Sequence, residues 1–174
     1  YQNVAYEASK AQCVTMLEII TFAMEDDEEL PKLLKEKAIS GLIIIGWMTR
    51  SYVEKIVNAA GIPVVLLDFQ MKGLRCDAVM SSNYVGMYKI TRYLLEKGHR
   101  DIAYVGSIQA NDNILDRYYG YRKALMEAGI HERKEWILED RDLAKGLSRV
   151  EIPENMPSAF ACNSDWAAGL LYNV

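Results

Sequence analysis

Short apolar runs alternate with helical patterns along almost the whole chain. Two of these runs, "GLIIIGW" (41–47) and "IPVVLLDF" (62–69), are apolar on both faces, and the first has the pattern of a central strand in a parallel sheet. We expect further strands in "DIAYVGS" (101–107), in "EWILED" (135–140) and at the start of "SAFACNSDWAAGLLYNV" (158–174). A β-rich run also occurs in "VTMLEIITFAM" (14–24).

Helical spacing of apolar residues separates these runs. It is present in "EELPKLLKEKA" (28–38) and in "SYVEKIVNAAG" (51–61). A long helix is expected to begin with Asn83 as its N-cap and to end at Gly98 in left-handed geometry. Its expected buried stripe consists of Tyr84, Met87, Tyr88, Thr91, Leu94 and Leu95. "ILDRYYGYRKALMEAGI" (114–130) predicts a second amphipathic helix.

Alternation of strands and helices predicts an α/β fold with parallel sheets, right-handed crossovers and helices on both faces. In such folds ligands bind beyond the carboxyl ends of the strands. Here those ends fall at Gly46, at Asp68-Phe69, in the loop 107–117 and between Asn163 and Trp166. The chain opens on a helix and closes on a helix that has barely begun, so we expect it to be part of a longer protein, incomplete at both ends.

Charge and composition narrow the classes of function. The 174 residues are 51% hydrophobic, which is enough to bury a core. Lys and Arg number 20 against 24 Asp and Glu, so the net charge is -4. A mildly acidic chain lacks the basic footprint of a nucleic-acid-binding surface. Any contact with DNA must therefore come from residues outside this sequence.

Cysteine and histidine usage argues against metal and disulfide chemistry. Cys13, Cys76 and Cys162 are far apart and odd in number, which fits free thiols in a reducing, cytosolic compartment. With only His99 and His131 besides, no cluster has zinc-ligand spacing. No apolar run reaches the roughly 18 residues of a membrane helix.

Motifs for nucleotide binding and nucleophilic catalysis are missing from the sequence. GxGxxG, GxxxxGK[ST] and GxSxG do not occur, and no base–nucleophile pair stands out. We therefore expect a protein without a cofactor that is not an enzyme.

Three charged residues stand at carboxyl ends of predicted strands. Arg117 follows a polar loop, Asp68 ends an apolar strand, and Asp165 lies between a strand and a helix. Each has a simpler interpretation, as a surface arginine, a turn aspartate and an N-cap, respectively. Brought to one cleft, one guanidinium and two carboxylates suit the vicinal hydroxyls of a sugar.

Aromatic side chains stand at similar strand ends. Trp47, Phe69 and Trp166 could offer apolar faces to a sugar ring. For each of them, packing in the core is the simpler role.

Four motifs in order give the chain a family resemblance. "GLIIIG" followed by "IPVVLLD", then "YLLEKGHRDIAYVGS", "RYYGYRKALMEAGI" and "PSAFACNSDWAAG" resemble the effector-binding core of the lactose/galactose repressor (LacI/GalR) family. The resemblance covers roughly residues 27 to 170. It implies a type I periplasmic-binding-protein fold, in which two Rossmann-like subdomains hold an effector between them.

On this resemblance, residues 1–80 form the N-terminal subdomain without its first strand, and 81–174 form part of the C-terminal one. The family's DNA-binding headpiece is not in this sequence. Arg117 matches the family's effector-binding arginine ahead of the "GY" pair, and Asp165 matches the aspartate of its Asn-Asp pair. Ser164 replaces the asparagine of that pair, and Asp68 sits where its strand enters the cleft, a position that often lines it in the family. Gly98-His99-Arg100 is expected to have a structural role, capping helix carbonyls.

The resemblance implies the effector-binding and dimerisation core of a cytoplasmic transcriptional regulator. A sugar or sugar phosphate is the leading effector class, although purines are also known as effectors in the family. The effector would bind between the lobes and change operator affinity in a homodimer, with no membrane involved. Three alternatives remain open: the sugar-binding protein of a transport system with the same fold, an α/β enzyme with an unrecognised site, and a binding domain without an effector.

Overall fold

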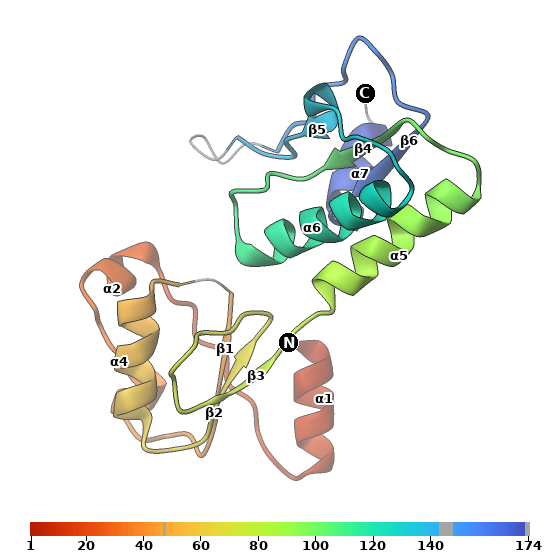
Figure 1. The fold of residues 1–174 in the computed structure, drawn as a ribbon. Coiled ribbons are helices and arrows are strands. Elements are labelled where there is room, and N and C mark those ends of the chain that lie inside the picture. Colours follow the sequence, from red (N-terminus) through yellow and green to blue (C-terminus); the bar gives the residue numbers. More distant parts are fainter. Residues whose placement is uncertain (47, 143–147, 173–174) are drawn as a thin grey trace. The chain divides into compact units, whose positions relative to one another are not determined.

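The computed structural model describes residues 1–46, 48–142 and 148–172. These residues form two compact units, Tyr1–Val79 and Met80–Val174. The predicted boundary after residue 80 lies one residue from this division. Each unit contains a three-stranded parallel sheet, so the α/β fold with parallel sheets is confirmed (Figure 1).

The first unit is built on the sheet β1-β2-β3. Its strands are β1 (Leu42–Ile45), β2 (Val64–Leu67) and β3 (Asp77–Val79). Its helices are α1 (Gln2–Lys10), α2 (Phe22–Asp26), α3 (Lys32–Lys35) and α4 (Arg50–Ala60). Alternate strand residues and one face of α4 form the core, which contains Ile44, Leu66, Tyr52, Val53 and Ile56. The strand–helix–strand order explains the parallel pairing of β1 with β2.

One expectation for the first unit was wrong, and one β-rich run does not form a strand. The central strand is β2, whereas β1 lies at the edge of the described sheet, with Ile43 and Ile45 43% and 49% exposed. The β-rich run in 14–24 forms no strand: residues 14–20 pair with no described strand, and Val14 is 90% exposed. A strand without a neighbour leaves its backbone polar groups unpaired, so β propensity alone does not create it.

The second unit is built on the sheet β5-β4-β6. Its strands are β4 (Ile102–Val105), β5 (Ile137–Leu138) and β6 (Ala159–Cys162), and a 3-10 turn η1 (Lys134–Trp136) precedes β5. All four residues of the central strand β4 are buried. Its two faces contribute to different clusters, one containing Ile102 and Tyr104 and the other Ala103 and Val105.

Helices cover both faces of this second sheet. α5 (Asn83–Glu96) and α6 (Asp112–Glu127) lie side by side, and Met87, Tyr118 and Tyr121 pack on one face (Figure 1). α7 (Asp165–Tyr172) packs through Ala167 on the other face, beside Trp136. The sheet is therefore the middle layer of a three-layer α/β unit.

Details of α5 differ from the sequence expectation. Met87 and Thr91 of the predicted stripe are buried, but Tyr84 is 37% exposed. Ser82, not Asn83, is the N-cap residue, because the Asn83 side chain forms bonds with α6 instead. A helix boundary moves easily by one residue when another partner attracts the capping side chain.

The Gly98-His99-Arg100 turn links α5 to β4 as a structural corner. Gly98 has a φ of +93°, and the His99 N–H donates to the Leu94 carbonyl. Arg100 does cap a helix, but its guanidinium donates to Ala128 O at the end of α6 (3.1 Å) rather than to α5. The corner therefore ties both helices to the start of the central strand.

Among the described helices, none is long and apolar enough to cross a membrane.

Candidate functional site

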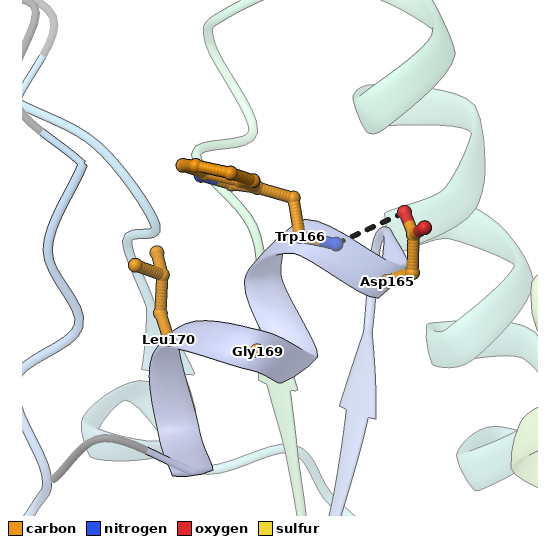
Figure 2. A pocket seen from close by; sticks show the side chains of 4 residues that line it. All are labelled: Asp165, Trp166, Gly169 and Leu170. Atoms are coloured by element: carbon orange, nitrogen blue, oxygen red, sulfur yellow. Dashed lines mark hydrogen bonds between the residues drawn. The ribbon is translucent and has the colours of Figure 1, made fainter.

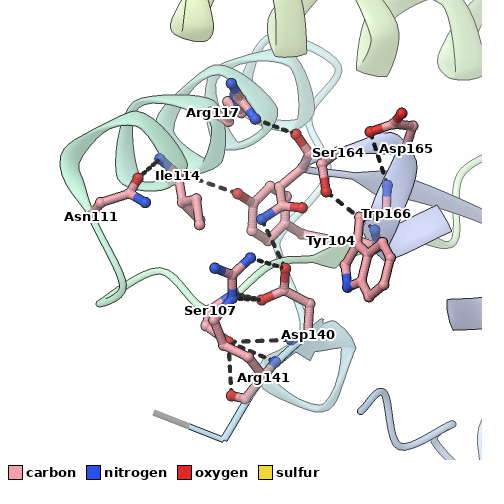
Figure 3. Close-up of polar contacts among 12 residues, drawn as sticks. Tyr104, Ser107, Asn111, Ile114, Arg117, Asp140, Arg141, Ser164, Asp165 and Trp166 are labelled. Atoms are coloured by element: carbon pink, nitrogen blue, oxygen red, sulfur yellow. Dashed lines mark hydrogen bonds and ion pairs between the residues drawn. The ribbon is translucent and has the colours of Figure 1, made fainter. Parts of the chain in front are cut away.

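Polar side chains gather at the carboxyl ends of the three strands of the second unit (Figure 3). Ser107 follows β4, Asp140 follows β5, and Asn163 follows β6. All three residues are buried, with exposed fractions of 1%, 0% and 5%. Their hydrogen bonds to one another explain why polar groups are accepted there.

Asp140 is the charged centre of this group. Its Oδ1 accepts from the Ser107 N–H (3.0 Å), and its Oδ2 accepts from Asn163 Nδ2 (3.2 Å). Arg141 adds two bonds from Nε (3.0 Å) and Nη2 (2.7 Å). Burial raises the pKa of Asp140, but the bonds from Arg141 and Ser107 outweigh it and lower the pKa to about 2. The carboxylate is therefore an anion at neutral pH.

Arg117 lies half-buried on α6, on a helix whose start is fixed by Asn111. The Asn111 side chain accepts from the Ile114 N–H (3.0 Å) and caps the helix. Arg117 Nε donates to Asn83 Oδ1 (2.8 Å), and Nη1 donates to the Asn163 carbonyl (2.5 Å). Toward the described residues, these bonds use two of the five N–H donors of the guanidinium.

Asp165 stands exposed at the start of α7. The N-cap role that the sequence allowed for it belongs to Ser164, whose Oγ accepts from the Ala167 N–H (3.1 Å). Asp165 instead accepts from the Trp166 N–H (3.0 Å). A carboxylate in the first turn is stabilised by the helix dipole and stays available to a ligand.

A hollow of about 320 Å³ adjoins Asp165 on the same helix (Figure 2). Trp166, Gly169 and Leu170 complete its lining, and Trp166 is 63% exposed. Of the three predicted aromatics, Trp166 is the one whose ring the described structure leaves open to solvent.

In the first unit the predicted residues lie at the end of β2. Asp68 is exposed and has a φ of +66°, a left-handed conformation that aspartate tolerates better than most residues. Phe69 is 7% exposed and belongs to the core cluster of Ile44 and Leu66. Trp47 lies outside the described residues.

Sequence reasoning missed the buried polar group around Asp140. "EWILED" was interpreted only as a strand, although its acidic end follows an apolar pair in the same way as Asp68 follows its strand. Asp140 and Asn163 each follow a predicted strand, and this position was the sequence signal that could have identified them. No sequence signal indicated that the Asn83 side chain would accept a hydrogen bond from Arg117 instead of capping its own helix.

No group of three His, Cys, Asp or Glu side chains that could hold a metal ion occurs in the part of the chain that the structure describes.

Parallel sheets, with polar groups at the carboxyl ends of the strands in the second unit, are typical of α/β folds that bind ligands at those ends. Residues 2–169 match the family described as "Periplasmic binding proteins and sugar binding domain of LacI family". The chain belongs to this family.

Curated relatives of the chain are transcriptional repressors. "HTH-type transcriptional repressor PurR" of Pectobacterium carotovorum subsp. carotovorum (strain PC1) is 31% identical over 142 residues, which cover 76% of this chain and 41% of the relative. PurR of Pasteurella multocida (strain Pm70) is 25% identical over 147 residues, 82% of this chain and 44% of the relative. The chain thus spans less than half the length of these two relatives.

Solved structures support the same fold. A putative ribose operon repressor from Burkholderia thailandensis aligns with a TM-score of 0.79 and 24% identity, over 99% of this chain and 65% of that one. A sugar-binding transcriptional regulator of the LacI family from Escherichia coli, complexed with phosphate, aligns with a TM-score of 0.67 and 16% identity, again over 99% and 65%. The predicted type I periplasmic-binding-protein fold is confirmed.

Proposed function

We propose that this chain is the effector-binding and dimerisation core of a cytoplasmic transcriptional regulator. The observation that carries the proposal is Arg117, which is fixed toward the described residues through two of its five N–H donors. Repressors among the curated relatives favour this role over transport and over catalysis.

The proposed effector is a sugar or a sugar phosphate. Arg117 would donate to hydroxyl or phosphate oxygens, and Asp165 and Asp68 would accept from hydroxyls. Trp166 offers an exposed ring that suits the apolar face of a sugar, with Trp47 as a further aromatic candidate, whereas Phe69 packs in the core. The ribose operon repressor and the phosphate-bound regulator among its structural neighbours are consistent with such ligands.

The proposed mechanism is a shift between two lobe arrangements. A ligand held by both lobes favours one arrangement only by its difference in affinity for the two. In a homodimer, that shift would change the spacing of two DNA-binding headpieces and hence operator affinity. Operator contact would come from residues outside this sequence, in line with its net charge of -4.

A thermal-shift screen of the complete protein tests the proposal. Sugars, sugar phosphates and nucleobases are added separately, and a ligand at about 100 times its Kd is expected to stabilise by roughly 2.7 kcal/mol. Such a gain corresponds to about 5–10 °C in a domain of this size.

Variants show whether a hit uses the proposed groups. Arg117→Lys and Asp165→Asn should each abolish the shift. A lysine keeps the positive charge but loses the bidentate hydrogen bonding of the guanidinium, and an asparagine loses the negative charge of the carboxylate. Arg92→Lys, an exposed arginine on α5, is the matched control and should keep the shift. A hit that survives Arg117→Lys and Asp165→Asn would contradict the proposed site. A screen in which no compound raises the Tm would contradict the sugar class of effector.

A further inference from the structure

Asp140 connects the three loops that follow the strands of the second unit. One carboxylate accepts from the backbone after β4, from the side chain after β6 and from its own neighbour Arg141. Ser107 returns the contact, since its Oγ accepts from the Asp140 N–H (3.2 Å). A buried anion with several donors has one well-defined geometry, because any displacement leaves charge uncompensated.

The same carboxylate sets the orientation of the Asn163 amide. Asp140 Oδ2 only accepts, so the Asn163 side chain must present Nδ2 to it. Asn163 Oδ1 is then left buried without a hydrogen-bond partner among the described residues. Leaving a buried oxygen unpaired costs free energy, so it is the hydrogen bond to Asp140 that holds the amide in this orientation.

Asn163 also binds Arg117 through its backbone. Its carbonyl accepts from Arg117 Nη1, while its side chain is fixed by Asp140. A continuous path of hydrogen bonds thus runs from the Asp140 carboxylate, through Asn163, to the Arg117 guanidinium on α6. Figure 3 labels the two ends of this path, Asp140 and Arg117.

We infer that Asp140 is a positioning residue for Arg117, acting through Asn163. The functional meaning of this inference rests on the proposed effector role of Arg117. Asp140 is fully buried, and its carboxylate oxygens accept hydrogen bonds from protein groups. Asp140 fixes the end of β6, so that the Asn163 carbonyl there orients the Arg117 guanidinium before a ligand arrives. This preorganisation lowers the entropic cost of binding.

Nuclear magnetic resonance of arginine side chains tests this without any ligand. The complete protein is labelled with ¹⁵N-arginine, and the Arg117 Nη–H signals, which include the Nη1 donor to Asn163, are assigned by their loss in Arg117→Lys. Solvent exchange of these protons is measured in the wild type, in Asp140→Asn and in Asn163→Ala. Glu139→Gln is the matched control, because it neutralises the exposed carboxylate next in sequence.

Exchange of the Arg117 Nη1–H protons, which donate to the Asn163 carbonyl, is expected to become about tenfold faster in Asp140→Asn and in Asn163→Ala, and to stay unchanged in Glu139→Gln. Arg100, which donates to the end of α6, serves as the internal reference and should not change. That selectivity separates positioning from a general loosening of the unit.

Unchanged Arg117 exchange in folded Asp140→Asn would overturn the inference, as would equal acceleration at Arg117 and Arg100. If Asp140→Asn does not fold, Asn163→Ala decides, because it cuts the path and leaves the Arg141 bonds to Asp140 in place. Since no effector is used, failure of the ligand screen and failure of this inference are separate results.

Discussion

Asp140 shows at the scale of one residue how a buried charge makes stability depend on pH. Its pKa in the folded state is about 2, below the ordinary value of 3.8. A lowered pKa means that the anion stabilises the fold fully above about pH 4, and that this contribution disappears as the pH falls towards 2. Ser107, Asn163 and Arg141 are the groups that face the carboxylate.

We therefore expect Asp140→Asn to lower the free energy of unfolding at pH 7 by about 3 kcal/mol, as for the loss of a buried, hydrogen-bonded charge. The difference between wild type and variant should shrink between pH 4 and pH 2. Urea denaturation of both proteins at several pH values measures it. A difference that stays constant down to pH 2 would contradict the assignment of the lowered pKa.

The sequence could indicate candidate residues only by their position after a predicted strand. Arg117 and Asp165 were proposed because each follows a strand or a loop at the carboxyl edge of the predicted sheet, and the structure places both in the second unit. Phe69 was proposed by the same rule but is in the core, because side chains at a strand end alternate between the two faces. The bonds of Asn83 depend on packing between helices, which the sequence does not display.

At the scale of elements, the contact between α5 and α6 depends on a missing side chain. A Cβ on Gly120 would lie 2.2 Å from the Tyr84 carbonyl oxygen and 2.9 Å from the Tyr88 nitrogen. Both are backbone atoms of α5, which cannot rotate away. Glycine at this position therefore sets how closely the two helices approach.

Gly120→Ala is expected to destabilise the fold by about 2 kcal/mol, because overpacking outweighs the gain in helix propensity. Gly86→Ala is the matched control on the facing helix, where an added Cβ meets nothing within 4 Å. It should stabilise by about 0.5–1 kcal/mol. Chemical denaturation compares the two, and equal effects of the same sign would refute the close approach.

Elements were predictable where a local pattern and a neighbouring strand agree. β4 and α4 fall where the sequence placed them, since burial on both faces and helical spacing are local properties. The run in 14–24 has strand composition without a described partner, and 135–140 yields only Ile137–Leu138 as strand. Pairing partners are distant in sequence, so this part of the fold could not be predicted locally.

For the whole molecule, the proposed function requires groups from both units. Asp68 belongs to the first unit, whereas Arg117 and Asp165 belong to the second. A ligand that contacts all three must couple the stability of the two units, because it binds only when both are folded.

Hydrogen exchange with and without the ligand identified by the screen measures that coupling. We expect protection to rise in α4 of the first unit and in α6 of the second. Asp68→Asn should remove the gain in protection in both helices, because it removes the negative charge that is proposed to contact the ligand. Asparagine tolerates the φ of +66°, so the backbone there should keep its conformation. Asp77→Asn, which neutralises an exposed carboxylate on β3, should leave the gain intact. Protection confined to the second unit and insensitive to Asp68→Asn would mean that the effector is held by that unit alone, and the mechanism of a lobe shift would then fail.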